Sequence, residues 1–304
     1  MKNVDIKEML LNEYFQLKIR NHEDAEKFIG RLEIYIAKEP DAGLSLVLLI
    51  LKTIKSNNDQ RSFLARCDVA APIFEQLEHT QEWRYLQLHV LSQVIANHTD
   101  FEKVHWFFQK AIDTINEKYA EEVKFKGIHT SLRYNLTVRI LRARYIDPDV
   151  SLKKLRPLFR RCYDHVMEVC VRKNLPLQHT LQVLRGVFEN KLELITEGLL
   201  KLKELGDTRL YKNTKHEIVE YLYYMEDIGT NQELLDFLTG YQIRERRMEL
   251  GVDAFTLAMS MDMEEDELKA IERGEATASI GLLMKISRRL GVSLNYFKRP
   301  RKQT

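Results

Sequence analysis

The most densely charged stretch of the chain runs from Asp262 to Glu275. It holds seven carboxylates but only two cations, Lys269 and Arg273. Carboxylates accept hydrogen bonds from amino groups, and they repel phosphates and other anions. Positive charge is concentrated at the end of the chain, in a basic tail that contains Lys298, Arg299, Arg301 and Lys302. The sequence therefore predicts two surfaces of opposite charge in the last sixth of the protein.

Other residues with chemical potential lack the spacing that catalysis or metal binding needs. The cysteines Cys67, Cys162 and Cys170 are odd in number and far apart, which favours buried free thiols over disulfides or a CxxC site. The nine histidines form no HExxH pair and no zinc-type spacing with cysteine. No nucleophile elbow, P-loop or dinucleotide-binding glycine motif is present. We expect no catalytic residues, no metal and no cofactor.

Length and composition are typical of a helical protein with two folded units. The chain has 304 residues, 44% of them hydrophobic and 30% charged, with only 12 glycines and 6 prolines. The longest apolar run, Leu44 to Leu51, is far shorter than the roughly 20 residues of a membrane helix, and the N-terminus lacks a signal sequence. We expect a cytoplasmic protein. Its net charge of +2 neither requires nor excludes a nucleic-acid partner.

From residue 3 to about 239, apolar residues recur every three or four positions and are interrupted by short polar breaks. This pattern predicts about ten helices joined by tight turns, as in helical-hairpin repeats. The segment Tyr85–Lys118 has the 34-residue length of a tetratricopeptide unit, although Ser92 replaces its glycine. We expect residues 1–239 to form a degenerate tetratricopeptide-like array or an irregular helical bundle, which senses a ligand or mediates dimerisation.

A second group of basic residues lies within this helical region. Arg133, Arg139 and Arg142 can share one helical face. In a helical array, such a face can line a concave groove that holds a peptide carboxylate or an acidic partner. The alternative is a solvated helix surface whose charge is balanced by acids on neighbouring helices.

The most specific pattern in the chain lies between Ile243 and Phe297. It reads Ile-Arg-Glu-Arg-Arg-Met-Glu-Leu-Gly at 243–251, Leu-Ala at 257–258, Leu-Lys-Ala-Ile-Glu-Arg-Gly at 268–274 and Leu-Leu-Met-Lys-Ile-Ser-Arg-Arg-Leu-Gly-Val-Ser at 282–293. In these motifs and their mutual distances, the chain resembles the Xre and lambdoid-repressor family of bacterial and phage regulators. The resemblance implies a five-helix helix-turn-helix domain over residues 240–297, followed by the basic tail 298–304. It also implies an internal ion pair between Arg247 and Glu272.

The same resemblance assigns the residues that would contact DNA. The turn is Met261-Asp262-Met263, and the recognition helix runs from Glu264 to Arg273. The positions that would face base edges in the major groove are Glu264, Glu265, Asp266 and Ala270. The positions implied to contact phosphate are Arg244, Lys269, Arg273, Lys298, Arg299, Arg301 and Lys302. Family members usually carry amides, hydroxyls or cations at the reading positions, so this acidic helix departs from the family pattern.

Two functions follow as expectations. The resemblance implies a transcription regulator that binds duplex DNA, as a homodimer because paired half-sites match a two-fold protein. The overall plan is similar to that of regulators that sense peptides through tetratricopeptide-like repeats, although those generally carry the DNA-binding unit first. The alternative is an antirepressor or adaptor, in which the helix-turn-helix fold is kept and its acidic third helix binds another protein.

Overall fold

The computed structural model of the chain describes residues 6–16, 22–58, 63–147, 149–170, 175–206, 208–222 and 232–297. These residues form fifteen α-helices and one short 3-10 helix, and no strand occurs among them. The expected all-α class is therefore confirmed. In this same part of the chain, no helix has both the length and the apolar character needed to cross a membrane.

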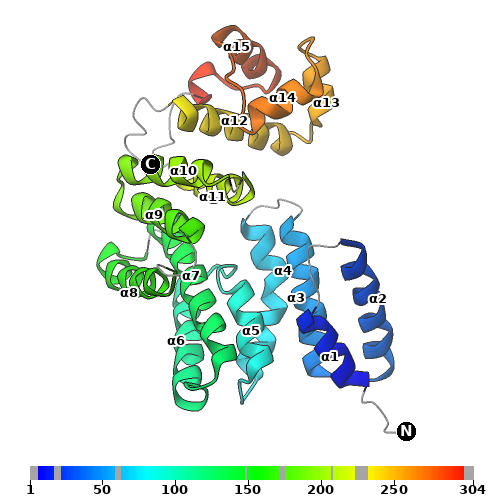
Figure 1. The fold of residues 1–304 in the computed structure, drawn as a ribbon. Helices are drawn as coiled ribbons and strands as arrows, with labels where there is room; N and C mark the ends of the chain where they lie inside the picture. The colour runs from blue at the N-terminus through cyan, green and yellow to red at the C-terminus, as the bar shows by residue number, and fades with distance from the viewer. Residues whose placement is uncertain are drawn as a thin grey trace. The chain divides into compact units, whose positions relative to one another are not determined.

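The chain divides into two compact units. The N-terminal unit comprises residues 1–143 and 149–169, and the C-terminal unit comprises residues 144–148 and 170–304. The helices of the N-terminal unit are α1 (Ile6–Gln16), α2 (His22–Lys38), α3 (Ala42–Asn58), α4 (Phe63–His79), α5 (Tyr85–Val94), α6 (Phe101–Lys118), nearly all of α7 (Val123–Ile146) and nearly all of α8 (Leu152–Cys170) (Figure 1).

Helices that follow one another in the sequence pack together in the N-terminal unit, as α2 does on α3 and α3 on α4. The segment Tyr85–Lys118 forms the two helices α5 and α6. The Asp100 carboxylate caps α6, because it accepts hydrogen bonds from the amides of Glu102 and Lys103 at 2.8 and 3.2 Å. Ser92 is buried and donates its hydroxyl to the carbonyl of His89 at 2.7 Å. The largest fully buried side chains of this unit include Phe28, Leu32, Leu44, Ile50, Ile73, Leu77, Trp83, Leu88, Phe107 and Phe125.

The arginines on α7 do not form the partner-binding groove that the sequence analysis considered. Arg139 is only 1% exposed and donates to the carbonyls of His98 and Thr99 at 3.0 and 2.7 Å. Arg142 is half-buried, with its guanidinium 3.5 Å from the centre of the Phe63 ring. The groove interpretation is therefore wrong for Arg139, because its charge serves the carbonyls between α5 and α6 and cannot reach a partner.

Two histidines of the N-terminal unit form a close pair. His129 Nδ1 on α7 lies 3.3 Å from His165 Nε2 on α8, so one ring must be neutral to donate to the other. Burial lowers the pKa of His129 to about 4, and the positive charge of Arg133 and the His165 ring lower it further. Protonation of this pair therefore opposes the folded packing of α7 on α8.

We expect the N-terminal unit to lose stability as the pH falls from about 6.5 towards 4. An exposed histidine titrates near about 6.5, so the unfolded chain binds this proton before the folded chain does. The stability that neutral His129 contributes is thus complete above that pH and is lost below it. Urea unfolding at pH 7 and pH 5 should show a smaller pH effect for His129→Gln than for the parent. His79→Gln, at an exposed position, should retain the parent's slope; equal slopes for all three chains would contradict the assignment.

The C-terminal unit contains three helices followed by a small bundle. Among the described residues its helices are α9 (Leu175–Glu189), α10 (Leu192–Glu204), α11 (Thr208–Leu222), α12 (Gln232–Glu249), α13 (Ala254–Met259), α14 (Glu265–Glu272), α15 (Ile280–Arg289) and the 3-10 helix η1 (Leu294–Phe297). Helix α10 packs on α9 and α11, and α12 packs on α14. Residues 232–297 are called the C-terminal bundle below.

Candidate recognition surface

The C-terminal bundle is built around one apolar core. The residue types needed for this core recur at helical spacing on α12, α13, α14 and α15, so each helix turns one apolar side inwards. The buried members of the core are Ile243, Ala254, Leu257, Ala258, Met261, Leu268, Ile271, Ile286, Leu290 and Phe297. The polar sides of the same short helices are left for solvent or a partner.

A tight turn joins α13 to α14. The Asp253 carboxylate caps α13 by accepting from the amide of Thr256 at 2.7 Å, and Asp262 adopts a positive φ of 56° that reverses the chain. Ala258 is fully buried where the two helices meet. Helix α14 begins at Glu265, with Glu264 as its N-cap residue. The turn and α14 therefore lie at the residues that the family resemblance assigned to them.

The structure brings Arg247 and Glu272 together as a bidentate ion pair. Nε and Nη2 of Arg247 lie 2.6 and 2.9 Å from the two carboxylate oxygens, and the side chains are only 11% and 5% exposed. Nη1 of Arg247 donates to the carbonyl of Val252 at 2.8 Å. The hydrogen bond to Glu272 raises the pKa of Arg247. This one guanidinium thus joins α12, the turn before α13 and the end of α14.

Two glycines allow α12 and the end of α14 to touch backbone to backbone. A Cβ atom at Gly240 would lie 2.0 Å from the carbonyl oxygen of Ile271. A Cβ atom at Gly274 would lie 2.5 Å from the Cα of Phe237, and Gly274 also has a positive φ of 62°. The resemblance anticipated a glycine at the end of the recognition helix but gave no role to Gly240. A glycine inside a helical pattern was the available signal.

Helix α12 runs without a break through the domain boundary expected between residues 239 and 240. Residues on both sides of that position contact the bundle. Thr277 donates its hydroxyl to the Asp236 carboxylate, and Lys215 Nζ on α11 lies 4.5 Å from the centre of the Phe237 ring. Lys212 on α11 also forms an ion pair with Glu275 at 2.8 Å. Helix α11 and the first turns of α12 therefore belong physically to the platform that holds α14.

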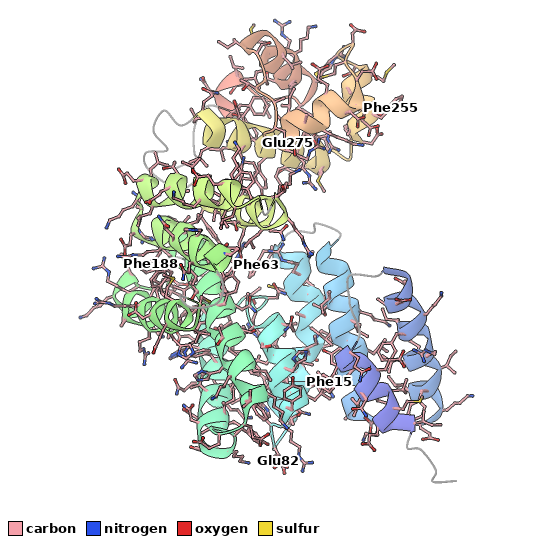
Figure 2. All side chains as sticks on the ribbon, viewed as in Figure 1. Phe15, Phe63, Glu82, Phe188, Phe255 and Glu275 are labelled. Atoms are coloured by element: carbon pink, nitrogen blue, oxygen red, sulfur yellow. The ribbon has the colours of Figure 1, made fainter. Side chains whose placement is uncertain are left out.

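The exposed side of α14 is acidic. Glu264 and Asp266 are exposed, whereas Glu265 and Ala270 are half-buried. Both cations of this helix already have carboxylate partners: Lys269 Nζ lies 2.8 Å from Glu265, and Arg273 Nε lies 2.8 Å from Glu275 (Figure 2 labels Glu275).

These two pairs are also visible in the titration of their members. The hydrogen bond to Glu265 raises the pKa of Lys269, and the hydrogen bonds from Lys212 and Arg273 lower the pKa of Glu275. The two cations that the resemblance assigned to phosphate are therefore paired inside the protein.

The other assigned phosphate contacts are further from α14 in sequence. Arg244 is half-buried on α12. The basic tail with Lys298, Arg299, Arg301 and Lys302 lies outside the described residues. Exposed cations that the resemblance did not assign to phosphate lie on α15, namely Lys285, Arg288 and Arg289.

The described residues contain no group of three or more histidine, cysteine, aspartate or glutamate side chains arranged to hold a metal ion. The three cysteines are free and buried, as expected from their spacing. Burial raises the pKa of Cys162 to about 12, which keeps this thiol protonated and unreactive. Comparisons of the chain with family models, curated proteins and solved structures found no match.

Proposed function

We propose that the C-terminal bundle contains an Xre-type helix-turn-helix domain and that the protein is a transcription regulator of bacterial or phage origin. The observation that carries this proposal is the presentation of α14. Its inner side is anchored by Leu268, Ile271 and the Arg247–Glu272 pair, while its N-terminal turn faces outwards. A helix held in this way, after a short turn, is what insertion into the major groove requires.

In this proposal, α14 supplies selectivity but little general attraction for DNA. Glu264, Glu265 and Asp266 would accept hydrogen bonds from cytosine amino groups in the major groove. Phosphate contacts would come from Arg244, from the tail cations and, after they exchange carboxylate for phosphate, from Lys269 and Arg273. The exchange costs part of the binding free energy, so affinity should be low on unrelated sequences. We further propose that the protein acts as a homodimer on paired half-sites and that its remaining helices sense a ligand.

The charges of α14 support a second candidate function, the binding of a basic protein surface. Lys269 and Arg273 are neutralised within the bundle. Beside this acidic helix, α13 exposes Phe255 and Met259, at 58% and 60% (Figure 2 labels Phe255). These two residues are four apart and therefore share one face of α13. Exposed apolar groups next to carboxylates suit a protein partner better than a sugar-phosphate backbone.

Removing two of the acidic charges should strengthen non-specific DNA binding. We expect the full-length double variant Glu265→Gln and Asp266→Gln to bind a random-sequence duplex roughly tenfold more tightly at low salt, because phosphate repulsion is relieved. Fluorescence anisotropy across a salt series measures this change. The double variant Glu117→Gln and Glu121→Gln, which removes two exposed carboxylates from the N-terminal unit, is the matched control and should leave affinity unchanged.

The same titrations separate the two candidate functions. Saturable binding of the parent chain to selected operator sequences supports the proposed regulator. If the parent binds no duplex at low salt while the glutamine variant does, the DNA-reading proposal is contradicted, and the acidic helix is better explained as a surface for a protein.

A further inference from the structure

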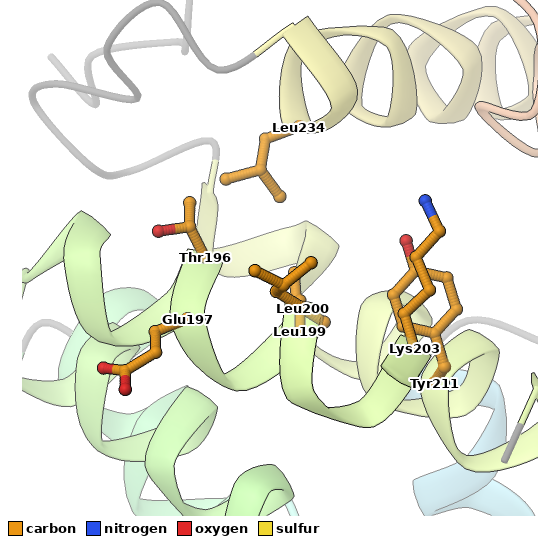
Figure 3. Close-up of a pocket in the computed structure, with 7 residues that line it drawn as sticks. All are labelled: Thr196, Glu197, Leu199, Leu200, Lys203, Tyr211 and Leu234. Carbon is orange, nitrogen blue, oxygen red and sulfur yellow. The ribbon is translucent and has the colours of Figure 1, made fainter. Parts of the chain in front are cut away.

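A pocket of about 320 Å³ opens between α10, α11 and α12 in the C-terminal unit (Figure 3). This volume lies at the lower end of the range found for small-molecule sites. The residues that line it are Thr196, Glu197, Leu199, Leu200, Lys203, Tyr211 and Leu234. None of them belongs to the acidic surface of α14 described above.

The centre of the pocket is apolar. Leu199 on α10 and Leu234 on α12 are almost fully buried and form part of its wall. Leu200 also lines the pocket, yet it is 53% exposed. Covering this side chain with an apolar group would remove unfavourable surface from water. A ligand for this pocket therefore needs an apolar body.

The polar groups are distributed unevenly around this apolar centre. Lys203 and Tyr211 lie at one end of the pocket, and Glu197 lies at the other (Figure 3). The Glu197 carboxylate already accepts a hydrogen bond from the side-chain amide of Gln182 at 2.9 Å. The end with Lys203 and Tyr211 thus offers a cation and a phenol hydroxyl, the groups that recognise a carboxylate.

We propose that this pocket binds a small amphipathic carboxylate, with its apolar chain against the three leucines and its anionic group beside Lys203. The same residues disfavour a ligand of the same shape with a cationic head, because that head would face the lysine. The site is independent of the proposed function, since its occupancy can be measured without DNA.

The pocket touches both elements that support α14. Leu234 lies on α12, the helix that continues to Gly240 and Arg247. Tyr211 precedes Lys212, which holds Glu275. Occupancy would therefore bear on the two contacts through which α11 and α12 position α14, and it would give the proposed regulator a chemical input.

Octanoate is a suitable probe, and calorimetric titration of the full-length protein measures its binding. We expect saturable binding of octanoate and at least about tenfold weaker binding of octyltrimethylammonium. Leu200→Glu should weaken octanoate binding by about tenfold or more, because it places a carboxylate in the apolar wall. Lys203→Gln should weaken octanoate binding and reduce its preference over the cationic probe.

Two residues of the same helix provide matched controls. Leu205 is also an exposed leucine, and Lys201 is also an exposed lysine, but neither lines the pocket. Leu205→Glu and Lys201→Gln should therefore bind octanoate like the parent. The proposal is overturned if the parent does not bind octanoate, if it binds both probes equally, or if the control variants lose as much affinity as Leu200→Glu and Lys203→Gln.

Discussion

The Glu272→Ala variant should open its C-terminal bundle far more readily than the parent chain. The substitution leaves the guanidinium of Arg247 in a site where its side chain is only 11% exposed, without the carboxylate that binds two of its nitrogens. Stranding a buried cation in this way costs about 3–5 kcal/mol of folding free energy. The loss should fall on α12 and α14 together, because the ion pair joins them.

Hydrogen exchange of the full-length protein localises this effect. Amides of α14 should exchange through an opening reaction whose free energy falls by the amount given above. Glu267→Ala removes an exposed carboxylate from the same helix and should change that free energy by less than about 0.5 kcal/mol. Equal exchange of α14 in the two variants would show that the ion pair does not hold the bundle together.

Gly240→Ala should destabilise the bundle by about 2 kcal/mol, although alanine normally favours a helix. The added Cβ would meet the Ile271 carbonyl oxygen at 2.0 Å. Because that oxygen belongs to backbone, the contact can be relieved only by moving α12 away from α14. The steric cost therefore exceeds the gain of up to about 1 kcal/mol in helix propensity. Hydrogen exchange in α14 again provides the measurement.

Gly127→Ala is the matched control for this substitution. Gly127 also lies inside a helix, α7, but an added Cβ would have nothing within 4 Å. This variant should be more stable than the parent by about 0.5–1 kcal/mol, measured by exchange of the α7 amides. If Gly240→Ala were stabilising as well, the close crossing of α12 and α14 would not occur in solution.

Features encoded by residues close together in the sequence were the most predictable ones. The turn before α14, the start of α14 near Glu264 and the helix-ending glycine Gly274 each depend on a few neighbouring residues. The pairing of Arg247 with Glu272 spans 25 positions, and the family resemblance supplied it. Helical periodicity alone was sufficient for the all-α class.

Features that depend on distant contacts were not predictable in the same way. Arg139 shares a helical face with other arginines in the sequence, but only the folded loop after α5 shows that its charge is used inside the protein. The pairing of Lys212 with Glu275 spans 63 positions and follows no local pattern. The domain boundary was placed at residue 240 because the family motif begins there, whereas α12 starts at Gln232.

The unbroken course of α12 also bears on how this protein can be rearranged in evolution. Domains that are joined by exposed linkers can be exchanged between proteins, because few contacts cross the join. Here a cut at residue 240 would divide a helix and remove Asp236 and Phe237, which contact Thr277 and Gly274. Recombination at that point would leave both products with an uncovered helix face. The C-terminal bundle and α11 should therefore be inherited together, as one unit of exchange.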